Sequence, residues 1–350
     1  MMVSNPTVEI IILTHNGEKN VDRCLNSVLK TDYDKLLITV VDNASTDNTS
    51  EILHRYKEIN LIESSKNIGF VGGNNLAMKR SKAKYLVLLN DDTMVDKYWV
   101  KELVKVAEAD ESVVALQPKV LWMMDASYFE YAGAAGSFMD IFGYTLCRGR
   151  VFDVVEKDLG QYDNIIDIFW ASGVAMFIRR SALEKIGYLD EDFFIYAEEV
   201  DLCWRMHLAG YKVKFVPMAR IYHLGRATMS REEYKFRKEY LLHRNHLIIL
   251  FKNYRLVTLL FIIPCKVLLE ILAFFAFLFR APLVSWAILS AFGWIIIKSP
   301  LMIRKNYEVK KIRKLSDYEV MGKMIWTSIP LSYYIFGKKS FRDFEKFINI

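Results

Sequence analysis

Tyr85-Leu86-Val87-Leu88-Leu89-Asn90-Asp91-Asp92 decides the fold of this chain, because an apolar run of strand length ends directly in an amide and two carboxylates. Such a run is typical of a strand buried on both faces of a parallel sheet. Two adjacent carboxylates repel each other unless water or a cation lies between them, and Mg²⁺ and Mn²⁺ prefer oxygen ligands. The stretch predicts a central strand whose carboxyl end faces a divalent cation and a phosphorylated ligand.

Two further carboxylate clusters follow the same rule. Val40-Val41-Asp42-Asn43 ends a second apolar strand, and Ala197-Glu198-Glu199-Val200-Asp201 begins a helix. Acids at the carboxyl ends of buried strands converge on the crevice where α/β folds bind ligands. Each cluster also has a purely structural interpretation, since residues 42–47 suit a strand-to-helix turn and acids favour helix N-termini.

The chain around these clusters alternates strands and helices. We expect strands at 8–14, 36–41, 60–62 and 85–89, and helices at 18–30, from Ser45 or Thr46 to Tyr56, and at 74–81. Apolar strands separated by helices predict a parallel sheet covered on both faces. Farther along, we expect order at 169–178, a helix from Ser181, and an acid-bearing helix at 197–209 that ends with Gly210 as its C-cap.

The character of the sequence changes after about residue 245. Residues 256–279 are apolar except for Lys266 and Glu270, and residues 281–297 carry no charge, so both runs approach the ~20 residues that cross a bilayer. Lys266 and Glu270 lie four apart on one helix face, where they can pair, and that face should pack on protein or lie near the lipid interface. The segment predicts two membrane helices, a re-entrant hairpin turning at 280–282, or an apolar dimerisation bundle.

Charge and composition indicate the cellular environment of the protein and the partners it could bind. Residues 298–314 hold seven basic residues against one acid, and basic residues beside an apolar span favour the cytoplasmic side and anionic lipid. No nucleic-acid-binding motif accompanies them, so we expect no nucleic-acid partner. The four cysteines have neither disulfide nor metal spacing, and the first residues do not resemble a signal peptide, which fits a reducing, cytosolic environment.

Taken together, these segments resemble the inverting family 2 glycosyltransferases of the GT-A fold. The resemblance covers about residues 8–223. The matching segments are Ile11-Ile12-Leu13-Thr14-His15-Asn16, Val41-Asp42-Asn43-Ala44-Ser45-Thr46-Asp47, Asn67-x-Gly69-Phe70-x-Gly72-Gly73-Asn74, Leu89-Asn90-Asp91-Asp92, Gly173-x-x-x-x-x-Arg179-Arg180, Glu198-Glu199-x-Asp201-Leu202-x-x-Arg205 and Tyr222-His223. It implies an α/β fold with a Rossmann-like mixed sheet (residues 1–245), followed by a membrane-associated helical region (246–350) made of the apolar hairpin 256–297, the basic flank and an amphipathic tail.

The resemblance also implies roles for individual residues. Asp42 would accept a hydrogen bond from the nucleotide base, and the glycine-rich stretch would let backbone approach the donor closely. The residues implied to bind the donor are Thr14, Asn16, Asp42, Asn43, Asn67, Gly69, Asn74 and Asp91. Asp92, Asp91 and His223 would hold Mg²⁺ or Mn²⁺, although a lone histidine in a strand-end loop is equally compatible with a structural role.

Catalysis by an inverting transferase needs a carboxylate that takes the proton of the acceptor hydroxyl. Glu199 occupies that position, and Glu198 beside it would keep Glu199 basic through like-charge proximity. Trp170 and Asp201 are candidates for the acceptor side, which the hard-to-assign region 115–168 would line. Trp170 could equally be a buried core residue.

Three features depart from the family pattern. Asn90 stands where the metal motif usually has Asp, and Glu199 stands where the base is more often Asp. The Gln-x-x-Arg-Trp signature of processive synthases is missing, since only Gln117 and Gln161 exist. We therefore expect transfer of one sugar at a time, and a catalytically silent nucleotide-sugar-binding scaffold stays open as an alternative. A nucleotidyltransferase is disfavoured because no glycine-rich, basic loop follows the first strand.

The expected partners follow from these roles. The donor would be a dTDP-, UDP- or GDP-linked sugar, with a deoxysugar favoured by the likeness to rhamnosyltransferases of the cell envelope. A membrane-anchored transferase with its catalytic domain on the cytoplasmic face implies a lipid-linked or glycan acceptor in polysaccharide assembly. An oligomer is possible.

Overall fold

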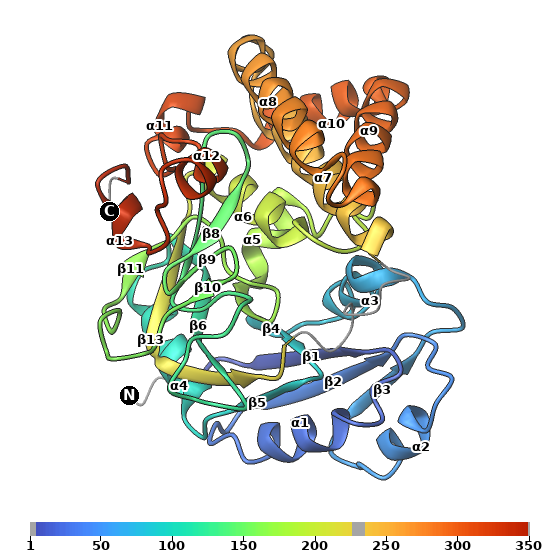
Figure 1. Ribbon diagram of the computed structural model, residues 1–350. Helices are drawn as coiled ribbons and strands as arrows, with labels where there is room; N and C mark the ends of the chain where they lie inside the picture. Colours follow the sequence, from blue (N-terminus) through green and yellow to red (C-terminus); the bar gives the residue numbers. More distant parts are fainter. Residues whose placement is uncertain (1–4, 226–234, 349–350) are drawn as a thin grey trace.

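The computed structural model describes residues 5–225 and 235–348 and has a mixed α/β sheet at its centre (Figure 1). Its strands run in the order β11-β13-β6-β12-β4-β1-β2-β3, with β5 paired to β13. β1 to β4 are parallel, whereas β12 is antiparallel to β4 and β6. The strands are β1 Val8–Thr14, β2 Leu36–Asp42, β3 Asn60–Glu63, β4 Tyr85–Asn90, β5 Thr93–Val95, β6 Val113–Trp122, β11 Ile166–Asp167, β12 Ala175–Arg179 and β13 Lys212–His223.

Helices cover both faces of this sheet, which confirms the predicted α/β architecture. Figure 1 shows α1 and α2 on one side of β1, β2 and β3, and α3 on the other. Apolar side chains of β1 alternate between the two cores: Ile10 and Ile12 pack with α1 and α4, whereas Ile11 packs with α3 and α6. The helices are α1 Val21–Val28, α2 Thr49–Leu53, α3 Gly69–Met78, α4 Trp99–Ala109, α5 Arg180–Ile186 and α6 Glu198–Leu208.

Two of the predicted helices have different bounds in the structure. The helix predicted at 74–81 is α3, which begins five residues earlier, at Gly69. The helix predicted to start at Ser45 or Thr46 is the short α2, and Asp47 rather than either of them receives the Thr49 backbone N–H at 3.0 Å. In both places, hydrogen bonding and packing of the loop outweigh local propensity.

Glycines let α3 lie directly on the sheet. A Cβ at Gly73 would lie 2.3 Å from a methyl carbon of Leu13 on β1. At Gly69, where φ is +76°, a Cβ would lie 2.6 Å from the Phe194 ring. Gly73 therefore allows close packing of α3 on β1, and Gly69 allows close packing of α3 against the loop before α6.

The region 115–168, which the sequence left unassigned, contains all of a second, four-stranded sheet, together with most of β6 and the short β11. That sheet runs β10 (Val154–Val155), β9 (Arg150–Val151), β8 (Thr145–Cys147) and β7 (Ser137–Met139). The end of the chain returns to cover it through α11 (Asp317–Met321), α12 (Ile329–Tyr334) and α13 (Arg342–Glu345). The Asp140 carboxylate accepts the Ile329 N–H at 2.9 Å, and the rings of Phe138 and Phe341 lie 5.2 Å apart.

A helical layer joins the two sheets on one side of the molecule. It consists of α7 (Lys235–Asn253), α8 (Leu256–Phe277), α9 (Pro282–Ile297) and α10 (Ser299–Ile312). The turn predicted at 280–282 separates α8 from α9, and Lys266 and Glu270 pair at 2.8 Å as expected. Within the described residues, α8 is the one straight helix long and apolar enough to cross a membrane, and α9 with α10 forms a pair bent by 72°.

The helical layer is tied to α6 by buried charges. Asp201 on α6 pairs with Arg205 at 2.9 Å and with Lys252 of α7 at 2.8 Å. Asp190 receives Lys252 at 2.7 Å and Lys305 of α10 at 2.6 Å. The division predicted between residues 245 and 246 falls inside α7, whose last turn carries one of these charges.

Gly73→Ala should destabilise the protein by about 1–3 kcal/mol, because the new methyl group overpacks the contact with Leu13. Gly293→Ala is the matched control, since it adds the same methyl group to α9, where nothing lies within 4 Å. That variant should be neutral or up to about 1 kcal/mol more stable. Urea unfolding followed by circular dichroism measures both; equal stability of the two variants would contradict the packing role.

Candidate active site

The carboxyl ends of β1, β2 and β4 bring the first candidate residues together. Thr14 and Asp42 end β1 and β2 in direct register, and Asp91 follows β4. The Thr14 hydroxyl donates to the Asp91 carboxylate. Gly17 lies against this pair, so closely that a Cβ there would be 2.2 Å from the Thr14 hydroxyl oxygen. The resemblance-based donor residues Thr14, Asp42 and Asp91 therefore form one cluster.

Other predicted donor-site residues build the loops around this cluster. The Asp42 carboxylate accepts the Ser45 N–H at 2.9 Å, and the Asn16 side-chain oxygen accepts the Thr46 N–H at 2.7 Å. Asn43 donates to the Asn67 side-chain oxygen at 3.1 Å. These bonds hold the loops after β1 and β2 against each other, at the edge where a nucleotide would bind.

Asn74 and Gly69 are placed differently from expectation. Asn74 is buried and donates to Phe70 O of its own helix at 2.9 Å. Gly69 faces Phe194, in the loop before α6, and the Val71 N–H donates to Phe194 O at 3.3 Å. The glycine-rich stretch thus packs against the loop that precedes α6, and the side-chain amide of Asn74 is bound to its own helix.

Asp92 and His223 lie together, as predicted. Antiparallel pairing of β5 with β13 sets His223 opposite Thr93, and His223 Nε2 lies 3.0 Å from Asp92 Oδ1. On its other side, His223 Nδ1 lies 2.9 Å from Glu130 Oε2, a buried carboxylate. Burial alone would lower the pKa of His223, but the two carboxylates overcome it and raise the pKa to about 10.

These side chains form an open, negatively charged cradle suited to a divalent cation. Burial, followed by the charge of Asp92, raises the pKa of Asp91 to about 7, although the Thr14 hydroxyl and the nearby His223 act in the opposite direction. Two carboxylates and one imidazole nitrogen are ligands that Mn²⁺ or Mg²⁺ accepts. In residues 5–225 and 235–348, no group of three or more His, Cys, Asp or Glu side chains is arranged to hold a metal ion by itself. A cation bound here would therefore take its remaining ligands from a diphosphate and water, and it would bind to His223 in its neutral form.

Glu198 and Glu199 lie at the start of α6, and no basic side chain pairs with them within residues 5–225 and 235–348. Glu198 is buried and Glu199 is partly exposed, and one oxygen of each carboxylate is buried without a hydrogen-bond partner among these residues. Burial raises the pKa of Glu199 to about 7, and burial together with the charge of Glu199 raises the pKa of Glu198 well above its usual range. Such uncompensated carboxylates are costly in a folded protein and are typical of general acid–base sites.

The backbone before α6 is held by α7. Tyr196 and Ala197 have φ values of +74° and +63°, which non-glycine residues rarely adopt. The buried Asn245 side chain donates to Ile195 O at 2.9 Å and to Tyr196 O at 2.7 Å, and its neighbour Arg244 donates to Phe193 O at 2.9 Å. Asn245 and Arg244 therefore stabilise the strained turn that aims Glu199.

The two predicted acceptor residues lie in the interior. Asp201 is fully buried and its charge is taken up by Arg205 and Lys252, so its observed role is to fix α6. Trp170 is 7% exposed and its indole N–H donates to Phe138 O at 2.9 Å. The core interpretation of Trp170, which the sequence left open, fits this position.

Three residues of the site were missed by sequence reasoning. Glu130 lies in the region that could not be assigned, and Asn245 falls on the predicted domain boundary. Gly17 directly follows the matched segment that ends at Asn16. Only glycine fits there because Thr14 and Asp91 lie against it, which the sequence does not show. Extending the matched segment by one residue, into the turn after β1, could have identified Gly17.

Sequence comparisons identify relatives over most of this fold. The glycosyl transferase family 2 model matches residues 9–187. The poly-beta-1,6-N-acetyl-D-glucosamine synthase of Staphylococcus aureus (strain COL) is 25% identical over 232 residues, which cover 64% of this chain and 51% of the synthase. The Staphylococcus epidermidis synthase is 25% identical over 221 residues, covering 61% of this chain and 48% of its own length. The chain thus spans about half the length of the curated relatives it matches.

Solved structures show the same fold at lower identity. GalNAc-T7 with UDP, GalNAc and Mn²⁺ has a TM-score of 0.56 and 17% identity, covering 71% of this chain and 48% of that one. The mannosyltransferase PcManGT from Pyrobaculum calidifontis, in complex with GDP-Man and Mn²⁺, has a TM-score of 0.50 and 17% identity, covering 89% and 86%. The mixed sheet has the GT-A architecture, and since the family model covers about half of the chain, this protein is a glycosyltransferase that belongs to glycosyl transferase family 2.

Proposed function

We propose that this glycosyltransferase transfers one sugar, with inversion, from a nucleoside diphosphate sugar to a hydroxyl group of a glycan acceptor. The observation that carries the proposal is the pair of carboxylates at the start of α6, each with one buried oxygen that has no hydrogen-bond partner in the described residues, beside loops that suit a nucleotide. The acceptor oxygen forms a bond to the anomeric carbon as the bond to the diphosphate breaks. The acceptor proton passes to Glu199, and the bonding electron pair leaves with the diphosphate.

Glu199 is assigned the role of base because it is the more exposed of the two acids. Glu198 is more deeply buried, and burial together with the charge of Glu199 raises its pKa well above its usual range, so Glu199 loses its proton first. Asn16, Asp42, Asn43 and Asn67 would surround the nucleotide, with the free oxygen capacity of Asp42 available to the base.

Asp92 and His223, with Asp91 beside them, would hold a divalent cation, and Glu130 would orient the His223 ring. Support comes from the donor set in this chain and from two structures with the same fold that were determined with Mn²⁺. When bound, the cation neutralises charge that develops on the leaving diphosphate. Asn90 leaves one carboxylate fewer in this cradle than the usual motif provides.

The setting of the reaction is proposed from the helical layer. The apolar helices and the basic flank support membrane association with the catalytic part on the cytoplasmic face, and hence a lipid-linked acceptor. The curated relatives are named for making a polysaccharide, which supports a role in polysaccharide or envelope glycan assembly. The missing Gln-x-x-Arg-Trp signature supports one transfer per encounter.

The direct test is turnover across a donor panel. Protein in lipid is incubated with UDP-, dTDP- and GDP-sugars and Mn²⁺, Mg²⁺ or EDTA, and release of nucleoside diphosphate is measured. We expect release with one class of donor and loss of release in EDTA. Binding of a donor without turnover under every condition would instead favour the scaffold alternative.

Glu199→Gln should lower kcat by roughly 10²–10⁴-fold, because the amide cannot accept the acceptor proton. In the wild type, kcat/KM should rise with pH through about 7, where Glu199 loses its proton, and level off above it. Stability should run the other way: the folded pKa is raised above the unfolded value of 4.5, so stability declines as pH rises from there to about 7.

Glu198→Gln is the matched control for this prediction. It keeps the base, and burial rather than Glu198 is what raises the pKa of Glu199, so activity should persist with the pH profile little changed. Glu199→Gln should be more stable than the wild type at pH 8 in urea unfolding, by roughly 1 kcal/mol, because it removes a buried unpaired charge. Full activity in Glu199→Gln would exclude Glu199 as the base.

Asp92→Asn should raise the Mn²⁺ concentration needed for half-maximal activity by more than tenfold, because it removes a charged ligand. Glu130→Gln should act in the same direction by about 10–100-fold, through looser orientation of His223. The measurement is Mn²⁺ titration of turnover, with the surface variant Asp125→Asn as control. An unchanged Mn²⁺ requirement in both site variants would place the cation elsewhere.

Asn245→Ala should lower kcat by about tenfold or more with little change in KM for the donor, because it frees the turn that aims Glu199. It should also lower the pKa seen in the pH profile as water reaches Glu199. Asn306→Ala is the matched control, since Asn306 likewise donates to three carbonyls, at 2.6–3.3 Å, but at the end of α7. Equal pH profiles in the two variants would reduce Asn245 to a purely structural role.

A further inference from the structure

Helix α8 has two sharply different faces. Its inner face is buried and consists of Leu259, Ile262, Lys266, Leu269 and Glu270. Its outer face is exposed, apolar and without charge along the whole helix. The residues of this outer face include Leu256, Val257, Leu260, Phe261, Cys265, Leu268, Ile271, Leu272 and Phe275.

The charges of α8 are directed into the protein. Lys266 is fully buried and its ammonium lies 3.5 Å from the centre of the Tyr144 ring. Glu270 accepts the Tyr144 hydroxyl at 3.0 Å and lies 2.8 Å from His243 Nδ1. Tyr144 belongs to the loop before β8 and His243 to α7, so the middle of α8 is docked on the catalytic part of the chain.

The start of α8 is also fixed to the rest of the protein. The Asp317 carboxylate accepts the Arg255 N–H at 2.8 Å and the Thr258 hydroxyl at 2.5 Å. To cross a bilayer, α8 would have to leave these partners and carry Lys266 and Glu270 into hydrocarbon, which costs several kcal/mol. In this arrangement, the outer face of α8 is free to contact a surface along its whole length, and the inner face packs on the protein.

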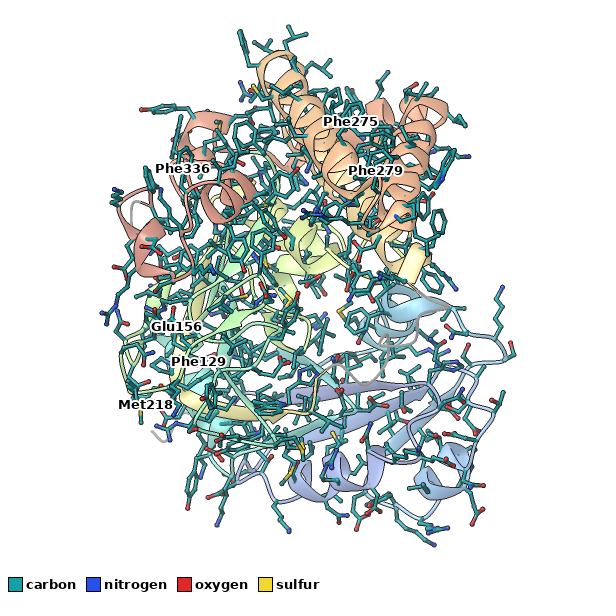
Figure 2. All side chains as sticks on the ribbon, in the orientation of Figure 1. Phe129, Glu156, Met218, Phe275, Phe279 and Phe336 are labelled. Atoms are coloured by element: carbon teal, nitrogen blue, oxygen red, sulfur yellow. The ribbon has the colours of Figure 1, made fainter. Side chains whose placement is uncertain are left out.

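Neighbouring helices add to the exposed apolar area. Leu283, Trp286 and Leu289 of α9 are exposed, as is Phe279 after α8. Figure 2 shows Phe275 and Phe279 on the helical layer, and Phe336 beside it in the C-terminal segment, all in the upper part of the view and apart from β1, β2 and β3. Apolar exposure of this extent on one layer is typical of a contact surface.

Charge identifies what this surface contacts. Arg255 and Arg280 are exposed at the two ends of α8, and α9 and α10 add further exposed basic residues, which are Lys298, Arg304, Lys310 and Lys311. Glu308 is the one exposed acid between residues 255 and 314, all of which the structure describes. A second copy of this chain would bring the same positive charge, whereas anionic headgroups complement it.

We propose that α8 lies in the plane of an anionic membrane surface, with its outer face at the boundary of headgroups and acyl chains and its inner face docked on the catalytic part. The protein is then bound to one leaflet and α8 does not span it. A helix of this kind is buried only about 5–10 Å into the boundary region. The proposal deepens the membrane association proposed above, and its test needs no turnover, so it can fail independently of glycosyl transfer.

Cys265 provides a depth reporter at the middle of α8. It is exposed on the outer face, whereas Cys24, Cys147 and Cys203 are buried. The full-length protein is labelled there with an environment-sensitive fluorophore and mixed with phosphatidylcholine vesicles with or without phosphatidylglycerol. Nitroxide quenchers are placed near the headgroup end or near the methyl end of the acyl chains, and Cys265→Ser is the labelling control.

We expect binding that depends on phosphatidylglycerol and stronger quenching from the headgroup end. Stronger quenching from the methyl end would place Cys265 near the bilayer centre and overturn the proposal in favour of a spanning helix. No binding to either vesicle, with self-association in solution, would also overturn it and assign the surface to a second copy.

Variants give a second measurement by vesicle flotation. Phe261→Glu combined with Phe275→Glu should lower partitioning about tenfold or more, because both charges fall on the outer face. Lys310→Glu combined with Lys311→Glu should lower it about tenfold or more on phosphatidylglycerol vesicles only. Leu159→Glu is the control, since Leu159 is 82% exposed and belongs to the loop before β11, not to the helical layer. Equal losses in this control would overturn the assignment of the surface.

Discussion

Asp201 is the charge around which the helices of this protein are assembled. It is fully buried on α6, and Arg205, Lys252 and Asn253 all direct polar hydrogens to it. Lys252 continues to Asp190, which Lys305 also reaches, so one network joins α6, α7 and α10. Removing one member of such a network leaves a buried charge unpaired, at a cost of about 3–5 kcal/mol. The network thereby fixes α6, which carries the candidate catalytic acids Glu198 and Glu199, relative to α7 and α10.

The candidate active site shows the opposite electrostatic arrangement. Glu198 and Glu199 lie within two to three residues of Asp201 on the same helix, yet no basic side chain in the described part of the chain pairs with them. Asp91 accepts the Thr14 hydroxyl and Asp92 pairs with His223, and burial raises the pKa of Asp91. The ion pairs around Asp201 and Asp190 stabilise the packing of the helices. The carboxylates of the candidate site lie where an acceptor proton and a cation would be bound. Uncompensated carboxylates are costly for folding, so the surrounding structure must hold these side chains in place.

Periodicity and carboxylate placement predicted the parts of the structure that depend on local sequence. β1 matches its predicted bounds, and Asp42, Asp91 and Asp92 lie at the carboxyl ends where they were expected. The predictions failed where contacts between residues far apart in the sequence determine the structure. α3 starts at Gly69, where φ is +76° and the Phe194 ring leaves no room for a side chain, and Asp201 pairs with a lysine 51 residues away. Glu130 had no local pattern, since its meaning depends on His223 across the sheet.

The position of α7 has a consequence for how such enzymes are recombined. Asn245 of α7 holds the turn before α6, while His243 of the same helix holds Glu270 of α8. C-terminal segments could be exchanged between relatives by cutting the chain after residue 245. The two halves of α7 would then come from different proteins, and one half would lose the matching carbonyl groups and acids that it contacts here. A segment that is exchanged between relatives should therefore begin before residue 235 and include the loop at 190–197. The helical layer and α6, which carries the candidate catalytic acids, are then transferred together.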